Sequence, residues 1–294
     1  MKTIQSVTLV LGLLLAVSFT SCQKEQAGVY HPKKKIQQVF ASSSHSDKAP
    51  YQHWDWNGDR LSSITHYSEF DYKGDIWIEN FTYDNDRLTR VDNYTTAEYI
   101  TYEYDGDNLK SATVFYRNAI VCTWTVSYED KHINKMVGTI YDYYKKDDLH
   151  LNPLAHLLPH SVCESVTQHE QELAAQRHQK GSYNLVLLLT WTDNNISKLV
   201  FTSEDDYFEF QLEYDDKICP MYGFMGNLED YMSNFVSGHT GFTKNNVTSM
   251  VITEDDYKDT LRFAYQYDID NYPVLQTLFM TDDPDDKQVL YYEY

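Results

Sequence analysis

A short motif recurs along most of this chain and constrains its fold more than any other feature. Each copy has two bulky side chains two positions apart, then a polar cluster rich in Asp, Asn and Gly, then Leu, Ile or Val. The clearest copies are WDWNGDRL at residues 54–61, FTYDNDRL at 81–88, YEYDGDNL at 102–109, VSYEDKHI at 126–133 and LTWTDNNI at 189–196, with looser copies at 214–218, 242–247 and 265–270. Apart from one long gap, the spacing is twenty-odd residues, which indicates a repeat architecture.

Each copy of the motif predicts a β-hairpin. Side chains two positions apart, such as Phe81 and Tyr83, lie on one face of a strand. Asn, Asp and Gly tolerate the positive φ angles that tight hairpin turns require. Leu88 and Val91 are three positions apart, which would place them on opposite faces. We therefore expect a β-bulge directly after the turn, so that both can pack on one side.

Linked hairpins predict an all-β fold, an antiparallel meander forming a curved sheet or an open barrel-like shape. Hairpin groups at residues 51–143 and 182–294 belong to a single repeat-hairpin domain, 51–294, and whether they form one sheet is left open. Between them, residues 144–181 break the pattern. The composition near 164–180 favours an inserted helix that ends before Gly181.

The first residues indicate export and a lipid anchor. Residues 1–21 have a short apolar core after Lys2, too short to span a membrane, which is typical of a secretory signal peptide. The chain then has Cys22 at the cleavage point, and this resembles the lipobox of bacterial lipoproteins, in which that cysteine is acylated. Residues 22–50 are expected to form a polar tether, with Lys33, Lys34 and Lys35 in water.

The repeats also carry a wider resemblance. The aromatic-x-aromatic-Asp unit resembles the YD or RHS repeat. Together with the lipobox and with YDDKICPMYGFMGN leading to FTKNNVTSM, the chain is similar to an uncharacterised family of YD-repeat-like lipoproteins of Bacteroidota. The resemblance implies an all-β fold and a location in the cell envelope, anchored to the outer membrane on a side that it does not specify. It brings no catalytic residues.

Charge and cysteine content limit the partners. A net charge of -20 argues against nucleic acid, because phosphate binding requires clustered Lys and Arg. The expected partners are a membrane, through the lipid, and a glycan or another envelope protein. Cys122, Cys163 and Cys219 allow at most one disulfide, whose pairing is open, and we expect buried small apolar side chains.

Metal binding has weak support, and no cofactor is expected. His156, His160 and Cys163 could meet on a helical turn, but Pro159 interrupts it, so a polar loop is the favoured interpretation. The acidic turns offer oxygen ligands for calcium but lack an EF-hand pattern, and Asp and Asn are common in hairpin turns for backbone reasons.

Aromatic side chains provide the remaining candidates for a binding site. The five tryptophans could stack on sugar rings, or they could form the packed side of the sheet, which is the favoured interpretation; they are Trp54, Trp56, Trp77, Trp124 and Trp191.

The chain has no Gly-x-Ser-x-Gly or His-Glu-x-x-His motif, so we expect no enzyme. The leading hypothesis is a lipid-anchored binding module for glycan or protein. A purely architectural spacer or shell is the alternative, and a hydrolase with an unrecognised carboxylate pair is the second alternative. The oligomeric state is not predicted.

Overall fold

The computed structural model describes residues 26–44, 46–67, 76–94, 97–141, 182–202, 207–225, 242–254, 257–280 and 287–294. Within this part, the chain forms sixteen strands and no helix. The strands are β1 (Gln38–Ser43), β2 (Ser46–Asn57), β3 (Arg60–Tyr67), β4 (Ile76–Asp84), β5 (Arg87–Asn93), β6 (Glu98–Asp105), β7 (Asn108–Tyr116), β8 (Ala119–Glu129), β9 (His132–Ile140), β10 (Tyr183–Thr192), β11 (Asn195–Thr202), β12 (Tyr207–Ile218), β13 (Asn245–Glu254), β14 (Tyr257–Tyr267), β15 (Pro273–Met280) and β16 (Lys287–Glu293).

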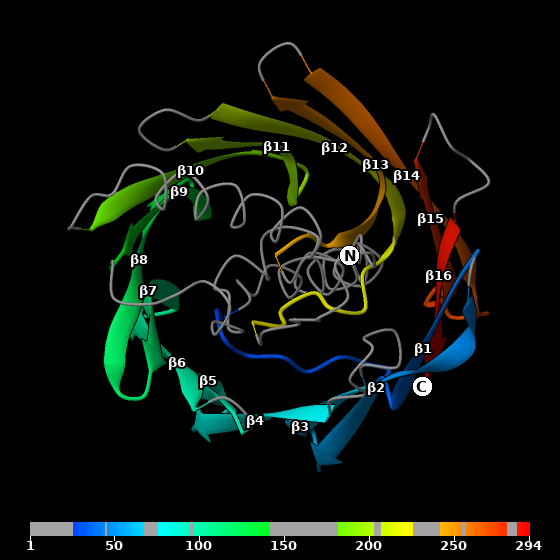
Figure 1. Ribbon diagram of the computed structural model, residues 1–294, viewed down its shortest axis with the longest axis horizontal. Coiled ribbons are helices and arrows are strands. Elements are labelled where there is room, and N and C mark those ends of the chain that lie inside the picture. The colour runs from blue at the N-terminus through cyan, green and yellow to red at the C-terminus, as the bar shows by residue number, and fades with distance from the viewer. Residues whose placement is uncertain are drawn as a thin grey trace, which may run out of the picture.

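The strands close into one antiparallel barrel, seen down its axis in Figure 1. Each strand pairs with its neighbours in sequence, and β1 closes the ring by pairing with β16. This confirms the predicted all-β meander of hairpins. Val137 on β9 lies opposite Val186 on β10, so the two hairpin groups form one continuous sheet. The helix predicted near 164–180 lies outside the described residues.

The polar clusters of the clear copies of the motif lie at strand ends, as predicted, whereas Asp215–Lys217 of the looser copy at 214–218 lie within β12. Asp84 lies opposite Arg87, and the two residues between them form the turn. Asn85 and Asp86 have φ angles of 54° and 126°, and other copies of the motif also have positive φ in the turn. Because Asn, Asp and Gly adopt this region most readily, the backbone conformation explains the composition of the clusters.

The predicted bulge is also present. The register of the β4–β5 pair shifts between Thr82 and Tyr83, which places Leu88 opposite Tyr83 and Val91 opposite Phe81. Leu88 and Val91 are therefore both buried, although they are three residues apart. The register shifts at the second aromatic of the other clear copies too, namely at Trp56, Tyr104, Tyr128 and Trp191.

Residues 26–50 are not the polar tether that the sequence suggested. They include β1, which pairs with both β16 and β2 and is needed to close the ring. Ahead of β1, Ile36 is fully buried and Tyr30 is nearly so. The prediction failed because this stretch lacks the hairpin motif and its strand finds a partner at the other end of the chain.

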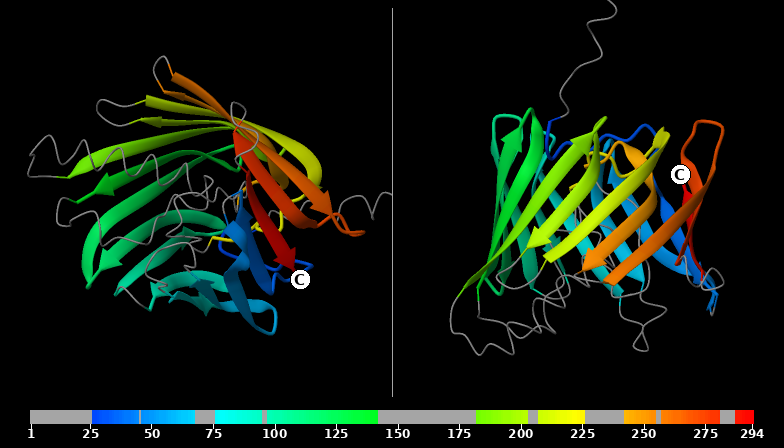
Figure 2. Two further views of the ribbon diagram at one scale, coloured as in Figure 1. Left: turned by 45° about the vertical axis from the view of Figure 1, so that its right-hand side comes forward. Right: turned by 90° about the horizontal axis from the view of Figure 1, so that it is seen from above.

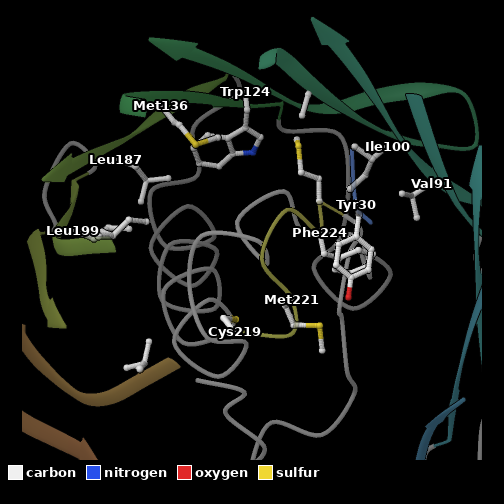
Figure 3. Close-up of a cluster of buried hydrophobic side chains, with 14 of the residues drawn as sticks. Tyr30, Val91, Ile100, Trp124, Met136, Leu187, Leu199, Cys219, Met221 and Phe224 are labelled. Carbon is white, nitrogen blue, oxygen red and sulfur yellow. The ribbon is translucent and has the colours of Figure 1, made fainter. Parts of the chain in front are cut away.

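Apolar side chains of the strands point into the barrel and fill it. Figure 3 shows Trp124, Met136, Leu187 and Leu199 directed inward from neighbouring strands towards the centre. These side chains belong to one buried cluster that includes residues from nearly every strand. The inward side chains of the described residues therefore form a packed apolar core.

Two segments that are not strands complete this core. Residues 26–36, here called the N-terminal segment, and residues 219–225, the inner segment, pack inside the strands (Figure 3). The Tyr30 hydroxyl donates a hydrogen bond of 2.7 Å to the carbonyl oxygen of Pro220. The Tyr102 hydroxyl on β6 donates one of 2.8 Å to the carbonyl oxygen of Met225. Both segments are thus fixed to each other and to the wall.

Candidate functional site

The predicted sugar-stacking tryptophans belong to the inner side of the barrel. Trp54, Trp77 and Trp124 are at most 2% exposed, so their ring faces are covered by protein atoms. Trp56 and Trp191 are partly buried, and each indole nitrogen donates a hydrogen bond to a backbone carbonyl oxygen, 2.7 Å from that of Ile36 and 2.6 Å from that of Ile133. These positions agree with the favoured interpretation, a role in the core. Trp54, Trp77 and Trp124 cannot reach an external ligand.

Other predicted site residues lie outside the described part. They are the lipidation site Cys22 and the weak metal candidates His156, His160 and Cys163. Cys122 and Cys219 are both buried, and burial raises the pKa of Cys122 above its ordinary value. Among the described residues, no group of His, Cys, Asp and Glu could hold a metal ion.

The acidic turns are tied to cations of adjacent turns. The Arg60 guanidinium bonds to Asp86 in the following turn, and the Arg87 guanidinium donates to the carbonyl oxygen of Gly106, 2.7 Å away. Asp59 is paired with Lys35 of the N-terminal segment at 2.7 Å. The Arg of one motif copy thus links its turn to the next, which gives these charges a role within the fold.

The described outer wall of the barrel carries both polar and apolar side chains. Outward positions alternate with the buried ones, and on β6, β7 and β8 the polar ones are Thr101, Glu103, Lys110, Ser111, Thr113, Thr123, Thr125 and Ser127. Tyr99, Phe115 and Ile120 also face outward on these strands, and Leu188 on β10 is 44% exposed. A barrel that crosses a membrane has a continuous apolar band outside and polar groups inside. In the described part, no helix is long and apolar enough to cross a membrane.

A shallow groove lies at one end of this wall, where the β5–β6 and β7–β8 connections meet. Its volume is about 420 Å³, which is within the usual range for small-ligand sites. Its lining consists of Asn80, Arg90, Asp92, Asn93, Tyr94, Ala97, Glu98, Tyr99, Arg117 and Asn118. The two arginines of this lining balance the charge of its two carboxylates, and most of the other lining residues are asparagines and tyrosines. We call this the rim groove.

The floor of the rim groove is held rigid by stacked planar groups. The Arg90 guanidinium lies over the Tyr99 ring, 3.7 Å from its centroid, and it bonds both carboxylate oxygens of Asp92 at 2.5 to 2.9 Å. These hydrogen bonds raise the pKa of Arg90 further. Tyr99 also stacks against Phe115, with ring centroids 4.5 Å apart and an angle of 12°. Such a stack presents fixed polar edges to a ligand.

The edges of the rim groove are more open. Tyr94 is 83% exposed. Opposite it on the β7–β8 turn, Arg117 lies over the Tyr116 ring at 4.8 Å, and the Asn118 amide oxygen accepts from the Tyr99 hydroxyl at 3.4 Å. The sequence did not predict these residues, because the repeated motif marks the tight turns and the groove lies at the opposite end of the hairpins. The signal in the sequence is Arg90-x-Asp92, two outward positions on one strand.

Comparison with known proteins gives a likeness of fold. No family model and no curated protein matches the chain. Among solved structures, the chain is similar to a porin-like protein from Bacteroides uniformis, with a TM-score of 0.51 and 10% identity, over 90% of this chain and 99% of that one. Also similar are a porin-like protein from Bacteroides vulgatus (TM-score 0.36, 10% identity, 88% and 98% covered) and a TcdB2-TccC3-Cdc42 structure (0.30, 13%, 82% and 12%).

The likeness is one of fold alone. At 10% identity the first of these structures supports the fold of this chain and carries no residue roles to it. The YD-repeat lipoprotein family of the sequence analysis remains a prediction.

Proposed function

We propose that this protein is a lipid-anchored, non-enzymatic binding protein of the cell envelope that takes a neutral glycan in the rim groove. The observation that carries the proposal is the direction of the side chains: among the described residues, apolar groups form a core inside the barrel, and many outward positions are polar. A barrel with this core and these outward groups has a surface that water can wet. It is suited to presenting a surface rather than to passing solutes.

The side-chain directions in this chain do not favour a pore, although two of its structural neighbours are described as porin-like. A Lys or Arg on a lipid-facing wall costs about 2–4 kcal/mol at the middle of a bilayer and about 0–1 kcal/mol near its surfaces. Lys110 and Lys135 are exposed near the turn ends of β7 and β9, in company with many Ser and Thr. Attachment through an acylated Cys22 places the barrel at a membrane without requiring its wall to enter the lipid.

The groove's chemistry favours a sugar. Saccharides present hydroxyl groups that planar amides, carboxylates and guanidinium groups bind, and a ring face that packs on an aromatic side chain. The rim groove offers Asn80 and Asn118 as amides, the Arg90–Asp92 pair as a fixed donor and acceptor, and Tyr94 as an exposed ring. Its balanced charge favours a neutral glycan over an acidic one.

The test is binding of the purified protein to an array of neutral and acidic glycans. Tyr94→Ala and Asn118→Ala should each weaken binding by about fivefold or more, because an aromatic or polar contact to the ligand contributes about 1 kcal/mol or more. Tyr207→Ala is the matched control, since Tyr207 is an exposed tyrosine on β12, away from the groove. Binding that is unaffected by Tyr94→Ala and Asn118→Ala would place the ligand elsewhere.

An architectural role is the second candidate. The ion pairs and hydrogen bonds that join successive hairpins give a stiff shell, which would suit a spacer. Absence of binding to any glycan or envelope protein would favour this role.

A further inference from the structure

We infer that the barrel stands on the membrane with the end that carries its tight turns facing the lipid and the rim groove facing away. This inference rests on the proposed anchor at Cys22. It adds a membrane-facing surface and a direction for the binding site, neither of which follows from lipidation alone.

The N-terminal segment fixes where the anchor can be. The Ala27 amide donates a hydrogen bond of 3.0 Å to the carbonyl oxygen of Asp107, in the β6–β7 turn. The Leu88 amide donates one of 2.8 Å to the carbonyl oxygen of Gly28. Gly28 lies so close to Tyr104 that a Cβ there would be 2.1 Å from the phenol oxygen. The first described residues of the chain therefore lie at the tight-turn end.

Further along, the same segment is attached to the turns on either side of β1. Lys34 Nζ lies 2.6 Å from Asp268 and 2.5 Å from Asp270 in the β14–β15 turn. Lys35 Nζ lies 2.7 Å from Asp59 in the β2–β3 turn. In the right-hand view of Figure 2, the blue segment before β1 and the C-terminus lie at the same upper end. We call this the turn end.

The remaining length of chain is short. Four peptide units separate Cys22 from residue 26, and a fully extended chain covers at most about 3.6 Å per residue, or about 14 Å. An acylated Cys22 lies at the lipid surface. The turn end must then stay within about 14 Å of that surface, whereas the strands carry the rim groove away from it.

The turn end is not itself adhesive to anionic lipid. Its turns carry carboxylates such as Asp105, Asp130 and Asp193, beyond those paired with lysine or arginine. Repulsion from an anionic surface acts over about 8–10 Å in physiological salt. Ile269, 96% exposed at the tip of the β14–β15 turn, is the apolar side chain placed to meet the lipid. The anchor, rather than the charged surface, thus holds this end in place.

The test compares two probes, one in the β14–β15 turn and one near the opposite end of β14. In full-length acylated protein carrying Cys163→Ser, a single fluorophore is attached through Ile269→Cys, at the turn end, or Lys258→Cys, near the opposite end of β14. Both positions are exposed. They are 11 residues apart, at most about 36 Å along the chain at about 3.3 Å per residue, and about 25–30 Å along the barrel axis for strands that tilt by about 35–45°. The protein is bound to phosphatidylcholine vesicles that contain a headgroup-labelled acceptor lipid.

Energy transfer to the acceptor should be at least about threefold stronger from position 269 than from position 258, given that separation. Equal transfer, or stronger transfer from position 258, overturns the orientation while the anchor stands. If the protein fails to float with vesicles, just as the Cys22→Ser variant does, then both the proposed anchor and the proposed orientation are wrong. Retained glycan binding in that case leaves the rim groove proposal intact.

Discussion

The Tyr214 hydroxyl donates a hydrogen bond of 2.7 Å to the backbone carbonyl oxygen of Ile196, the aliphatic residue that ends the preceding copy of the motif. The same relationship joins Trp191 to Ile133 at 2.6 Å and Tyr104 to Leu88 at 2.5 Å. The second aromatic of the motif thus does two things: it packs inward, and its polar tip links one hairpin to the one before. This explains why Tyr and Trp, rather than Phe, hold that position in the clear copies.

Tyr214→Phe should lower the free energy of unfolding by about 1–2 kcal/mol, because the carbonyl oxygen of Ile196 loses its partner in a largely buried place. The measurement is denaturant-induced unfolding. Tyr207→Phe is the control: its hydroxyl bonds to Glu209 on the exposed wall, and the change should stay within about 0.5 kcal/mol. Equal effects of the two variants would show that the link between repeats contributes nothing specific.

Gly138→Ala should also destabilise the barrel. A Cβ at residue 138 would lie 2.7 Å from ring atoms of Trp124 on the adjacent strand, and overpacking of this kind costs about 1–3 kcal/mol. Adding Trp124→Phe makes room, so the double variant should lose less stability than the sum of the two single changes. Strict additivity in calorimetric or denaturant unfolding would contradict this close contact.

Lys131→Gly should stabilise the protein by about 0.5–1 kcal/mol. Lys131 has a φ of 73°, which is unfavourable for a side chain with a Cβ but free for glycine. Lys135→Gly on the same strand, β9, should have the opposite sign, because glycine weakens a strand interior by about 0.5–1 kcal/mol. The pair is compared by denaturant midpoints, and a loss of stability in both variants would argue against the turn conformation.

Acid should destabilise the fold through His66. Its Nε2 lies 3.1 Å from a carboxylate oxygen of Glu79, both side chains are fully buried, and burial lowers the pKa of His66 to about 3. Below its ordinary pKa of about 6.5, the unfolded chain binds a proton that the folded chain does not, so stability falls as the pH drops from about 6.5 towards 3.

His66→Gln removes this titration and keeps an amide donor near Glu79. The dependence of unfolding free energy on pH between about 6.5 and 4 should become shallower by up to about 1.4 kcal/mol per pH unit. His53→Gln, on the partly exposed side of β2, serves as the control. An unchanged acid slope in His66→Gln would mean that another group dominates acid unfolding.

The hairpins, their turns and the bulge could be predicted because they follow from local rules: the aromatic pair sets a face, Asn85 and Asp86 set a turn, and the spacing of Leu88 and Val91 requires an extra residue. Closure of the barrel could not be predicted. It depends on β1 meeting β16, a contact between sequence-distant strands that no local pattern marks.

The candidate site could not be predicted from the sequence for a related reason. Arg90, Asp92 and Tyr99 come together because β5 and β6 pair in one register, with Asp92 opposite Tyr99, and sequence alone does not fix that register. The sequence left open whether the tryptophans lie in the core or bind a sugar. Alternation of side chains along a strand shows which residues share a face of the sheet, but not which face other segments cover. The N-terminal and inner segments, which pack inside the barrel, decided that question.

The direction of side chains in the barrel is the central claim, and neighbouring residues on β9 test it most directly. Lys135 is exposed on the wall and Met136 is fully buried inside. With Cys163→Ser in full-length protein at a membrane, Lys135→Cys should react rapidly with a charged, membrane-impermeant thiol reagent, and Met136→Cys should not react until the protein is unfolded. The reverse result, with residue 136 labelled through a water-filled channel and residue 135 shielded by lipid, would contradict the account.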